Sequence, residues 1–283
     1  MSDYIICIPS YKRAKLCNEK TLATLHKHKI PAKKINIYVA NKEEYDLYLA
    51  TIDKSLYNKL IIGKLGLVNQ RQFIMDSLKE GQEIVFMDDD VKSIDLSLST
   101  LFKSHSLDYF IKEAFKVCKK ENAYIWSVYP VYNPFFRKNQ KEITTDLRYQ
   151  IGAFYGIINR PKCGDLKLTM DNKEDVERTI KFFIKDGKVI RFNRIGFETK
   201  YYNPDGSGLG TFEARLKPML ESSKKLLKMY KNYGKIKTRK SGMTEFVLYR
   251  LTEPVSSSSS LSTKNKTQKV KNPKNKKTKK NKK

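Results

Sequence analysis

Residues 84–90 read Ile-Val-Phe-Met-Asp-Asp-Asp, four apolar residues followed at once by three carboxylates. The apolar run predicts a strand that is buried on both faces, as strands of a parallel sheet are. Ligands of open α/β sheets bind beyond the carboxyl ends of the strands, which is where the three aspartates lie. In an extended chain Asp88 and Asp90 point to one face and Asp89 to the other. The pattern therefore predicts that Asp88 and Asp90 share a hard divalent cation, Mg²⁺ or Mn²⁺, and the alternative is an acidic turn after a strand.

The first eighty residues alternate between apolar strand patterns and helical patterns. Strands are predicted at Tyr4–Pro9, Lys34–Ala40 and Leu60–Ile62, and helices at Asn18–Lys27, Lys42–Ala50 and Leu67–Leu78. Alternating units of this kind form βαβ crossovers. The pattern therefore predicts an α/β fold with a doubly wound, mostly parallel central sheet flanked by helices.

The second half of the chain is more mixed, and its end has a different composition. Helices are predicted at Ser106–Lys120 (with Ser106 as the cap), Glu174–Lys185 and Phe212–Asn232, and strands at Ala123–Tyr129, Ala153–Asn159, Lys188–Phe192 and Thr244–Leu251. After Pro254 a run of serines precedes a run of lysines, and no acidic or aromatic residue occurs. Such a segment cannot bury a core, so we expect one domain over residues 1–253 and a disordered basic tail over residues 254–283.

The charge of the chain is strongly positive. Its 283 residues include 57 Lys and Arg against 30 Asp and Glu, which gives a net charge of +27. Residues 264–283 contribute 11 lysines and no acid, which leaves +16 on the rest of the chain. This balance predicts a polyanionic partner, with nucleic acid as the first candidate and an anionic membrane surface as the second. The tail is expected either to attract nucleic acid or to serve as a solvating or targeting segment.

The sequence shows no pattern of export or membrane insertion. No apolar run reaches the roughly 18 residues of a membrane span. The start, Met-Ser-Asp-Tyr, lacks the basic and apolar regions of a signal peptide. The four cysteines form no close pair, so neither a zinc site nor a disulfide framework is expected. We therefore expect a soluble cytoplasmic protein.

Two further segments are predicted to lie at the same sheet edge. Pro9-Ser10-Tyr11-Lys12-Arg13 follows the first strand, and a nucleotide could stack on Tyr11 and pair its phosphates with Arg13. Gly66-Leu67-Val68-Asn69-Gln70-Arg71 begins the helix before the aspartate strand, and a helix N-terminus favours phosphate. An ordinary basic loop is the alternative for the first segment.

The three segments together resemble glycosyltransferases of the GT-A fold. The "IPSYKR" start, the "GLVNQRQFI" helix and the "MDDD" strand end occur in the family's order and approximate spacing. The chain is most similar to the TET-associated glycosyltransferases of phages and large viruses, relatives of the base J glucosyltransferases. The resemblance covers roughly residues 4–250. It implies a nucleotide-sugar donor, most readily a UDP-sugar, and Mn²⁺ or Mg²⁺ as cofactor, in a virus or a phage-infected host cell.

The resemblance also implies roles for particular residues of the donor site. Asp90 would be the direct metal ligand, and Asp88 would contact the donor ribose or the metal shell. The other implied donor-binding residues are Pro9, Ser10, Tyr11, Arg13, Gln70, Arg71, Asp89, Gly152 and Gly156. The two glycines would allow the backbone to approach the donor sugar, and packing glycines in a strand are the alternative. Many GT-A enzymes add a C-terminal histidine to the metal shell. No histidine follows His105 here, so Asp205 is a candidate in its place.

On the acceptor side the resemblance implies a carboxylate base. Asp175 is the preferred base, with Glu174 as its neighbour or substitute, and a single base implies direct displacement with inversion. The alternative is that acidic residues at a helix start only complement the helix dipole. The acceptor implied is hydroxymethylated pyrimidine in DNA. Residues 129–138, rich in aromatic and basic side chains, could contact an extruded base, and ordinary loop packing is as good a reading.

Two other functions fit the same sequence features. The first is the same fold acting on a glycan or protein acceptor. The second is a non-catalytic nucleic-acid-binding protein on a degenerate glycosyltransferase scaffold, which the basic charge would also suit.

Overall fold

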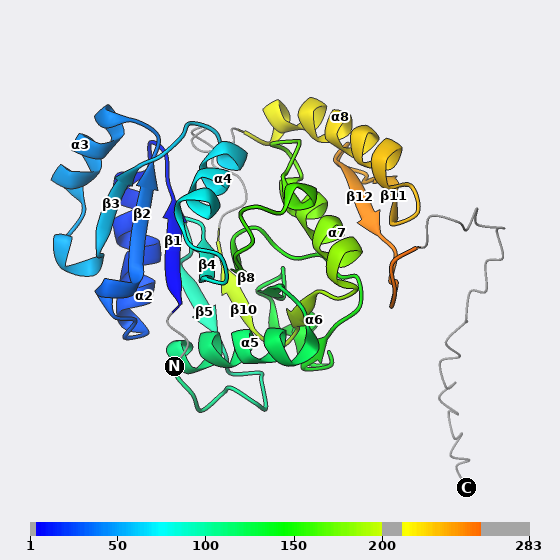
Figure 1. Ribbon diagram of the computed structural model, residues 1–283, viewed down its shortest axis with the longest axis horizontal. Helices are drawn as coiled ribbons and strands as arrows, with labels where there is room; N and C mark the ends of the chain where they lie inside the picture. Colours follow the sequence, from blue (N-terminus) through cyan, green and yellow to red (C-terminus); the bar gives the residue numbers. More distant parts are fainter. Residues whose placement is uncertain (1–3, 200–210, 256–283) are drawn as a thin grey trace, which may run out of the picture.

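A mixed eight-stranded sheet forms the centre of the molecule in the computed structural model, which describes residues 4–199 and 211–255 (Figure 1). Its strands are β1 (Ile5–Pro9), β2 (Ile35–Val39), β3 (Lys59–Ile62), β4 (Glu83–Met87), β6 (Ile125–Val128), β7 (Ile143–Thr144), β8 (Phe154–Ile158) and β9 (Ile190–Phe192). The order across the sheet is β3-β2-β1-β4-β8-β6-β9-β7. Strands β3, β2, β1 and β4 are parallel, and β8 is antiparallel to both of its neighbours.

Two small two-stranded sheets accompany the central one. Strand β5 (Ser93–Asp95) pairs with β10 (Gly196–Glu198), and β11 (Gly234–Thr238) pairs with β12 (Thr244–Leu248), both antiparallel. The helices are α1 (Ala14–Cys17), α2 (Ala23–Lys27), α3 (Lys42–Thr51), α4 (Leu67–Ser77), α5 (Leu107–Glu121), α6 (Pro134–Arg137), α7 (Glu174–Asp186) and α8 (Phe212–Tyr230). A π-helical turn over Asn18–Leu22 joins α1 to α2. Figure 1 shows α8 and the β11–β12 hairpin at the end of the molecule opposite α3.

The helices bury one apolar cluster on each face of the sheet. Side chains of α1, α2, α3 and α5 pack on one face, around Trp126. Side chains of α4, α7 and α8 pack on the other, around Tyr155 and Phe86, whose rings stack with centroids 5.0 Å apart. Because the strands are apolar on both sides, the site is confined to the rim of the sheet.

The sheet register sets a row of residues on the α7 face. Phe86 of β4 lies opposite Tyr155 of β8, Tyr155 opposite Ser127 of β6, and Ser127 opposite Arg191 of β9. Since β8 runs antiparallel to both β4 and β6, those two strands end at the same edge. The chain leaving Met87 and the chain leaving Val128 therefore enter the same side of the molecule.

The fold class expected from the sequence is confirmed, and so are its main helices and strands. Ser106 caps α5 as predicted, since its hydroxyl accepts a hydrogen bond from the backbone N–H of Tyr109. The sequence patterns missed β5, β7, β10, β11, α1 and α6, most of them too short to show a period. The predicted tail and the loop with Asp205 lie outside the described residues, apart from Pro254 and Val255. Within the described chain, no helix is both long and apolar enough to cross a bilayer.

Candidate functional site

A cavity of about 300 Å³ opens at the carboxyl edge of the parallel strands. Its walls come from the segments that follow β1, β2, β3 and β4: Pro9, Ser10, Tyr11, Arg13, Ala40, Lys64, Leu65, Gly66, Leu67, Gln70, Asp88 and Asp89. The sequence-derived donor residues Pro9, Ser10, Tyr11, Arg13, Gln70, Asp88 and Asp89 are among them. Ala40, Lys64 and Leu65 were missed, although each follows a strand that the patterns had located. The rule that ligands bind beyond strand ends would have found them.

The β3–α4 loop is held in place by Gln70. The side-chain oxygen of Gln70 accepts from the backbone N–H of Lys64 at 2.7 Å, and its amide nitrogen donates to Val39 O at 3.0 Å. A Cβ on Gly63 would lie 2.0 Å from that oxygen, so only glycine fits there. Gly66 has a φ of +91°, which places it in the region that favours glycine, just before α4. Gln70 thus lines the cavity mainly as the anchor of its loop.

Asp89 and Asp90 are both paired with Arg13. One guanidinium nitrogen of Arg13 lies 3.3 Å from Asp89 Oδ1 and 3.1 Å from Asp90 Oδ2. Asp89 also accepts a hydrogen bond from Ser10, whose hydroxyl lies 2.6 Å from that of Tyr48. Asp90 accepts a second hydrogen bond from Thr199. Burial raises the pKa of Asp89 to about 7, although Arg13 opposes the shift.

Asp88 has a different ion-pair partner from Asp89 and Asp90. Strand β4 ends at Met87 and the chain turns at Asp89 and Asp90, so the alternation of an extended strand does not continue to Asp90. Asp88 instead pairs with Arg71 at 3.0 Å. The cavity wall therefore contains Asp88 and Asp89 rather than Asp90. Asp90 is still close enough to Asp88 for its charge to raise the pKa of that carboxyl, so a cation shared by the two stays a prediction.

Arg71 joins Asp88 to the start of α7. Its guanidinium, 2% exposed, contacts Asp88, Gly152 O at 2.8 Å and Glu174. The other carboxylate oxygen of Glu174 accepts from Arg178, which is 5% exposed. Glu174 is therefore a buried carboxylate between two guanidinium groups. Both of its oxygens are occupied by these cations, so the role of Glu174 is to link α4 to α7.

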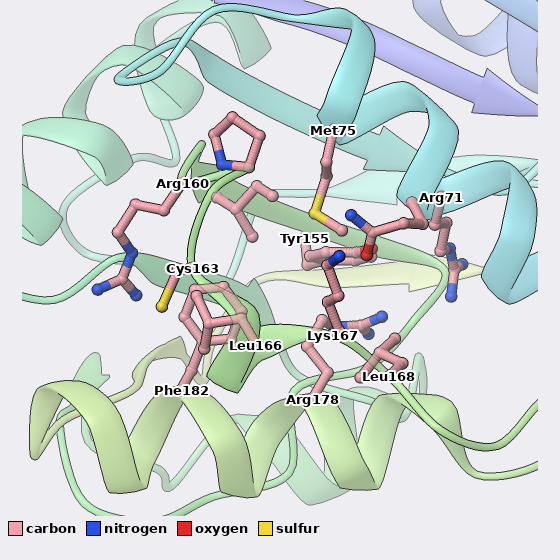
Figure 2. Close-up of a pocket in the computed structure, with 13 residues that line it drawn as sticks. Arg71, Met75, Tyr155, Arg160, Cys163, Leu166, Lys167, Leu168, Arg178 and Phe182 are labelled. Carbon is pink, nitrogen blue, oxygen red and sulfur yellow. The ribbon is translucent and has the colours of Figure 1, made fainter.

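A small pocket of about 20 Å³, room for about one water, lies behind this network between α4, β8 and α7. Figure 2 shows Tyr155 between Arg71, which comes from α4, and Arg178, which comes from α7. The guanidinium carbon of Arg178 lies 3.8 Å from the centre of the Tyr155 ring, and that of Arg71 lies 5.5 Å from it. The aromatic ring thus fixes the two cations that hold Glu174.

Asp175 has surroundings that suit a base better than those of Glu174. Its Oδ2 accepts a hydrogen bond from the Tyr149 hydroxyl, and its Oδ1 accepts from the backbone N–H of Val176 at 2.9 Å. Burial, assisted by the neighbouring charge of Glu174, raises the pKa of Asp175. No guanidinium forms an ion pair with Asp175 among the residues described, so its carboxylate can accept a proton. Both acids also lie in the first turn of α7, as the dipole interpretation requires.

The two glycines assigned to the donor site have different surroundings. A Cβ on Gly152 would lie 3.1 Å from Glu174 Oε1 and 3.5 Å from Asp175 Cβ, so Gly152 lets its loop pass close to both acids. A Cβ on Gly156 would lie 2.3 Å from the Trp126 ring. Gly156 therefore packs against the core in the middle of β8, and neither glycine lines the cavity.

The aromatic and basic stretch at residues 129–138 contains both exposed and buried side chains. Phe135 is 69% exposed and Phe136 is 49% exposed. Arg137 is fully buried and pairs with Asp95, so it is not a surface cation. Tyr129 has the guanidinium carbon of Arg191 5.1 Å from its ring centre.

The aspartates fit a divalent cation that arrives with a diphosphate. They offer only carboxylate oxygens, the ligands that Mg²⁺ and Mn²⁺ prefer. Asp88 is 36% exposed, and its Oδ2 accepts no hydrogen bond from a described residue. Burial and the nearby Asp90 raise the pKa of Asp88 to about 6, with Arg71 opposing. In the described part of the chain, no three His, Cys, Asp or Glu side chains form a group able to hold a metal. A cation would therefore take most of its ligands from phosphate and water, as Mg²⁺ commonly does.

Comparison with known proteins bears on the fold. No family model and no curated protein sequence matches the chain. Among solved structures, the mannosyltransferase PcManGT from Pyrobaculum calidifontis, in complex with GDP-Man and Mn²⁺, matches with a TM-score of 0.50 and 13% identity, over 81% of this chain and 64% of that one. TarS 1-349 from S. aureus in complex with UDP matches at 0.48 and 14%, over 80% and 66%. Glucosyl-3-phosphoglycerate synthase from Mycobacterium tuberculosis, with Mn²⁺, UDP and phosphoglyceric acid, matches at 0.48 and 10%, over 88% and 87%.

At these identities the likeness concerns the fold alone. The chain spans about two thirds of the length of the TarS and PcManGT structures that it matches. The narrower resemblance to the TET-associated enzymes is not tested by these matches and stays a prediction. The chain has a GT-A-like α/β fold, as its three sequence segments indicated.

Proposed function

We propose that this protein is a glycosyltransferase that takes a sugar from a nucleotide-sugar donor. The observation that carries the proposal is the cavity at the carboxyl edge, whose wall combines cations with carboxylates. Arg13 and Lys64 can pair with phosphates, and Tyr11, 36% exposed, offers a ring for stacking a base. Asp88 and Asp89 stand in the same wall. A nucleoside diphosphate needs this combination, since its phosphates carry both the negative charge and the metal.

Asp88 and Asp90 would hold the divalent cation, which when bound would stabilise the negative charge of the departing nucleoside diphosphate. The chain's own contribution is to fix these carboxylates. Arg71 orients Asp88 from α4, and Arg13 with Thr199 orients Asp90. The β3–α4 loop, anchored by Gln70, would place Lys64 beside the phosphates. Because these groups are positioned before the donor binds, little reorganisation is needed during the reaction.

Asp175 would accept the proton of the acceptor hydroxyl. A base is most effective when its pKa approaches the working pH, and burial moves the pKa of Asp175 in that direction. One carboxylate base without a second nucleophile supports direct displacement and inversion at the anomeric carbon. Glu174, locked between Arg71 and Arg178, would position α7 and Asp175 against Asp88.

The acceptor that we propose is a hydroxymethylated pyrimidine in DNA. The support is the net charge of +27, which favours a polyanionic acceptor over a neutral glycan. Transfer onto hydroxymethylated DNA, measured beside plain DNA and a glycan acceptor, tests this part separately. Transfer to the glycan with none to DNA would refute it.

Donor binding can be tested before the acceptor is known. A nucleoside diphosphate panel with Mn²⁺ should raise the melting temperature of the protein. At a ligand concentration 100 times Kd the stabilisation is about 2.7 kcal/mol, or roughly 5–10 °C for a domain of this size. Asp88→Asn should lose the shift. Asp46→Asn is the matched control, since Asp46 lies on α3, 57% exposed, away from the cavity wall. Equal shifts with and without Mn²⁺ would contradict the metal role, and no shift with any nucleotide would contradict the donor site.

A further inference from the structure

A second group of cations lies on the α7 face of the sheet, beyond the donor cavity. Arg191 belongs to β9 and is only 8% exposed. Its Nε donates to Asn193 Oδ1 at 2.7 Å, and its guanidinium carbon lies 5.1 Å from the Tyr129 ring centre. In the described chain no carboxylate forms an ion pair with Arg191. A nearly buried arginine without an acidic partner is unusual, because burial of an uncompensated charge is costly.

Two more arginines approach Arg191 from neighbouring segments. Arg191 lies opposite Thr144 of β7, and the chain continues from there to Arg148. Leu147 N donates to Leu251 O at 2.8 Å, which brings Arg250 beside the same segment. Burial and the nearby charge of Arg148, with a smaller effect of Arg250, lower the pKa of Arg191 to about 10. Asp146, already paired with Arg148 at 2.7 Å, is the carboxylate near Arg191 and leaves the group with an excess of positive charge.

The arginine group lies close to the proposed base. Tyr149, next to Arg148 in the sequence, donates its hydroxyl hydrogen bond to Asp175. Gln150 N donates to Thr179 Oγ1 at 3.0 Å, so residues 148–150 run along the first turns of α7. Arg191 is two strands from Tyr155 in the sheet row, about 10 Å at the usual strand spacing of about 4.8 Å. The segment that holds Asp175 in place therefore also carries one of the three arginines.

We propose that Arg148, Arg191 and Arg250 form a binding site for a phosphate group of the acceptor. The inference rests on the proposed function, because it assigns the ligand of the acceptor side. Arg191 has no ion-pair partner among the described residues, and a phosphate would supply one, since guanidinium groups match its oxygens in charge and geometry. Bound there, the phosphate holds the acceptor while a neighbouring hydroxyl reaches Asp175. The phosphate can belong to a polynucleotide backbone or to a small phosphorylated acceptor, and the two sources give different results below.

The first measurement uses the full-length protein and a labelled single-stranded oligodeoxynucleotide, without donor. Single linkages are replaced in turn by uncharged methylphosphonate, and binding is followed by fluorescence anisotropy. For the wild type, one or two neutral linkages should weaken binding several-fold more than the others. In Arg148→Gln and Arg191→Gln that position dependence should disappear. The slope of log K against log salt should also fall by about 0.7, the value for one single-strand phosphate contact.

The second measurement follows the melting temperature in inorganic phosphate. If the source is a small phosphorylated acceptor, phosphate raises the melting temperature of the wild type but not of Arg191→Gln, and no linkage of the oligonucleotide stands out. Arg191→Lys, which keeps the charge, should retain part of either effect. Arg239→Gln is the matched control, since Arg239 lies at the far turn of the β11–β12 hairpin and pairs with Glu245.

Each result bears on the phosphate site alone. If binding depends on the position of the neutral linkage in the wild type but not in the variants, the ligand is a phosphate of the polynucleotide backbone. If inorganic phosphate raises the melting temperature of the wild type but not of Arg191→Gln, the ligand is a small phosphorylated acceptor. If neither signal differs between wild type, Arg148→Gln and Arg191→Gln, the inference is refuted. Because no donor is present, failure here leaves the proposed sugar-donor function untouched, and that function fails separately if the nucleotide panel gives no shift.

Discussion

Glu174 and Asp175 are adjacent acids to which the structure gives opposite roles, and matched amide substitutions separate them. Glu174 lies between the guanidinium groups of Arg71 and Arg178, with both arginines almost fully buried. In Glu174→Gln one oxygen can still accept from one arginine, but the amide NH₂ then faces the N–H groups of the other. Among the described residues, the donors to the Asp175 carboxylate are the Tyr149 hydroxyl and the backbone N–H of Val176. Asp175→Asn therefore removes a charge that forms no ion pair with the buried Arg71 or Arg178.

The two substitutions are expected to change different quantities: Glu174→Gln the stability, and Asp175→Asn the rate of sugar transfer. Loss of one partner from a buried ion pair costs about 3–5 kcal/mol, so Glu174→Gln should lower the melting temperature by roughly 6–20 °C. Folding raises the pKa of Asp175, which means that its ionised form is destabilising at neutral pH. Asp175→Asn should thus keep or raise the stability, while sugar transfer falls by about 10²–10⁴-fold, the usual contribution of a general base.

Urea denaturation and calorimetry of both variants, with sugar transfer measured on the folded fraction, decide between these roles. Donor binding by Asp175→Asn, read from the thermal shift with nucleotide and Mn²⁺, should match the wild type. The reasoning is refuted if Glu174→Gln is as stable as the wild type and loses transfer, while Asp175→Asn retains it.

Two further changes test the cavity loop and the base. In Gly63→Ala the new Cβ would lie 2.0 Å from Gln70 Oε1, so the Gln70 side chain that anchors the loop must move. We expect the free energy of unfolding to fall by about 1–3 kcal/mol and the KM for the donor to rise. An unchanged denaturation curve and an unchanged KM would contradict the anchoring role. In Tyr149→Phe the carboxylate loses a hydrogen bond that lowers the pKa of Asp175, so that pKa rises further. Since Asp175 must be ionised to act, the acid limb of kcat/KM for transfer should move to higher pH, and a limb that stays in place or moves to lower pH would exclude Asp175 as the titrating base.

Much of the fold and part of the site could be read from the sequence. The apolar run before Asp88 and the run that ends at Pro9 indicated buried strands, and the short apolar run before Gly63 indicated a third strand. The residues that follow them were therefore placed at one edge, and most line the cavity. Periodicity also located α7, and with it the position of Glu174 and Asp175.

The rest depended on tertiary contacts that no local pattern records. Because the chain turns after Met87, Asp90 pairs with Arg13 and Asp88 pairs with Arg71. Glu174 and Asp175 are neighbouring acids in the sequence, and their side-chain partners distinguish them. Glu174 contacts Arg71, 103 positions away, and Arg178, whereas Asp175 accepts a hydrogen bond from Tyr149. The approach of Arg148 and Arg250 to Arg191 likewise follows from strand pairing, through β7 and the segment after β12.

Hydrolysis of a UDP-sugar panel by the full-length protein, with and without Mn²⁺, tests the central claim most directly. The wild type should release nucleoside diphosphate from one donor, chelation by EDTA should abolish the release, and Mn²⁺ should restore it. Asp88→Ala and Asp90→Ala should each be slower by at least about 10²-fold, since each removes charge stabilisation at the leaving group. Release at the same rate in the wild type and both variants, or no release from any nucleotide sugar, would contradict the account.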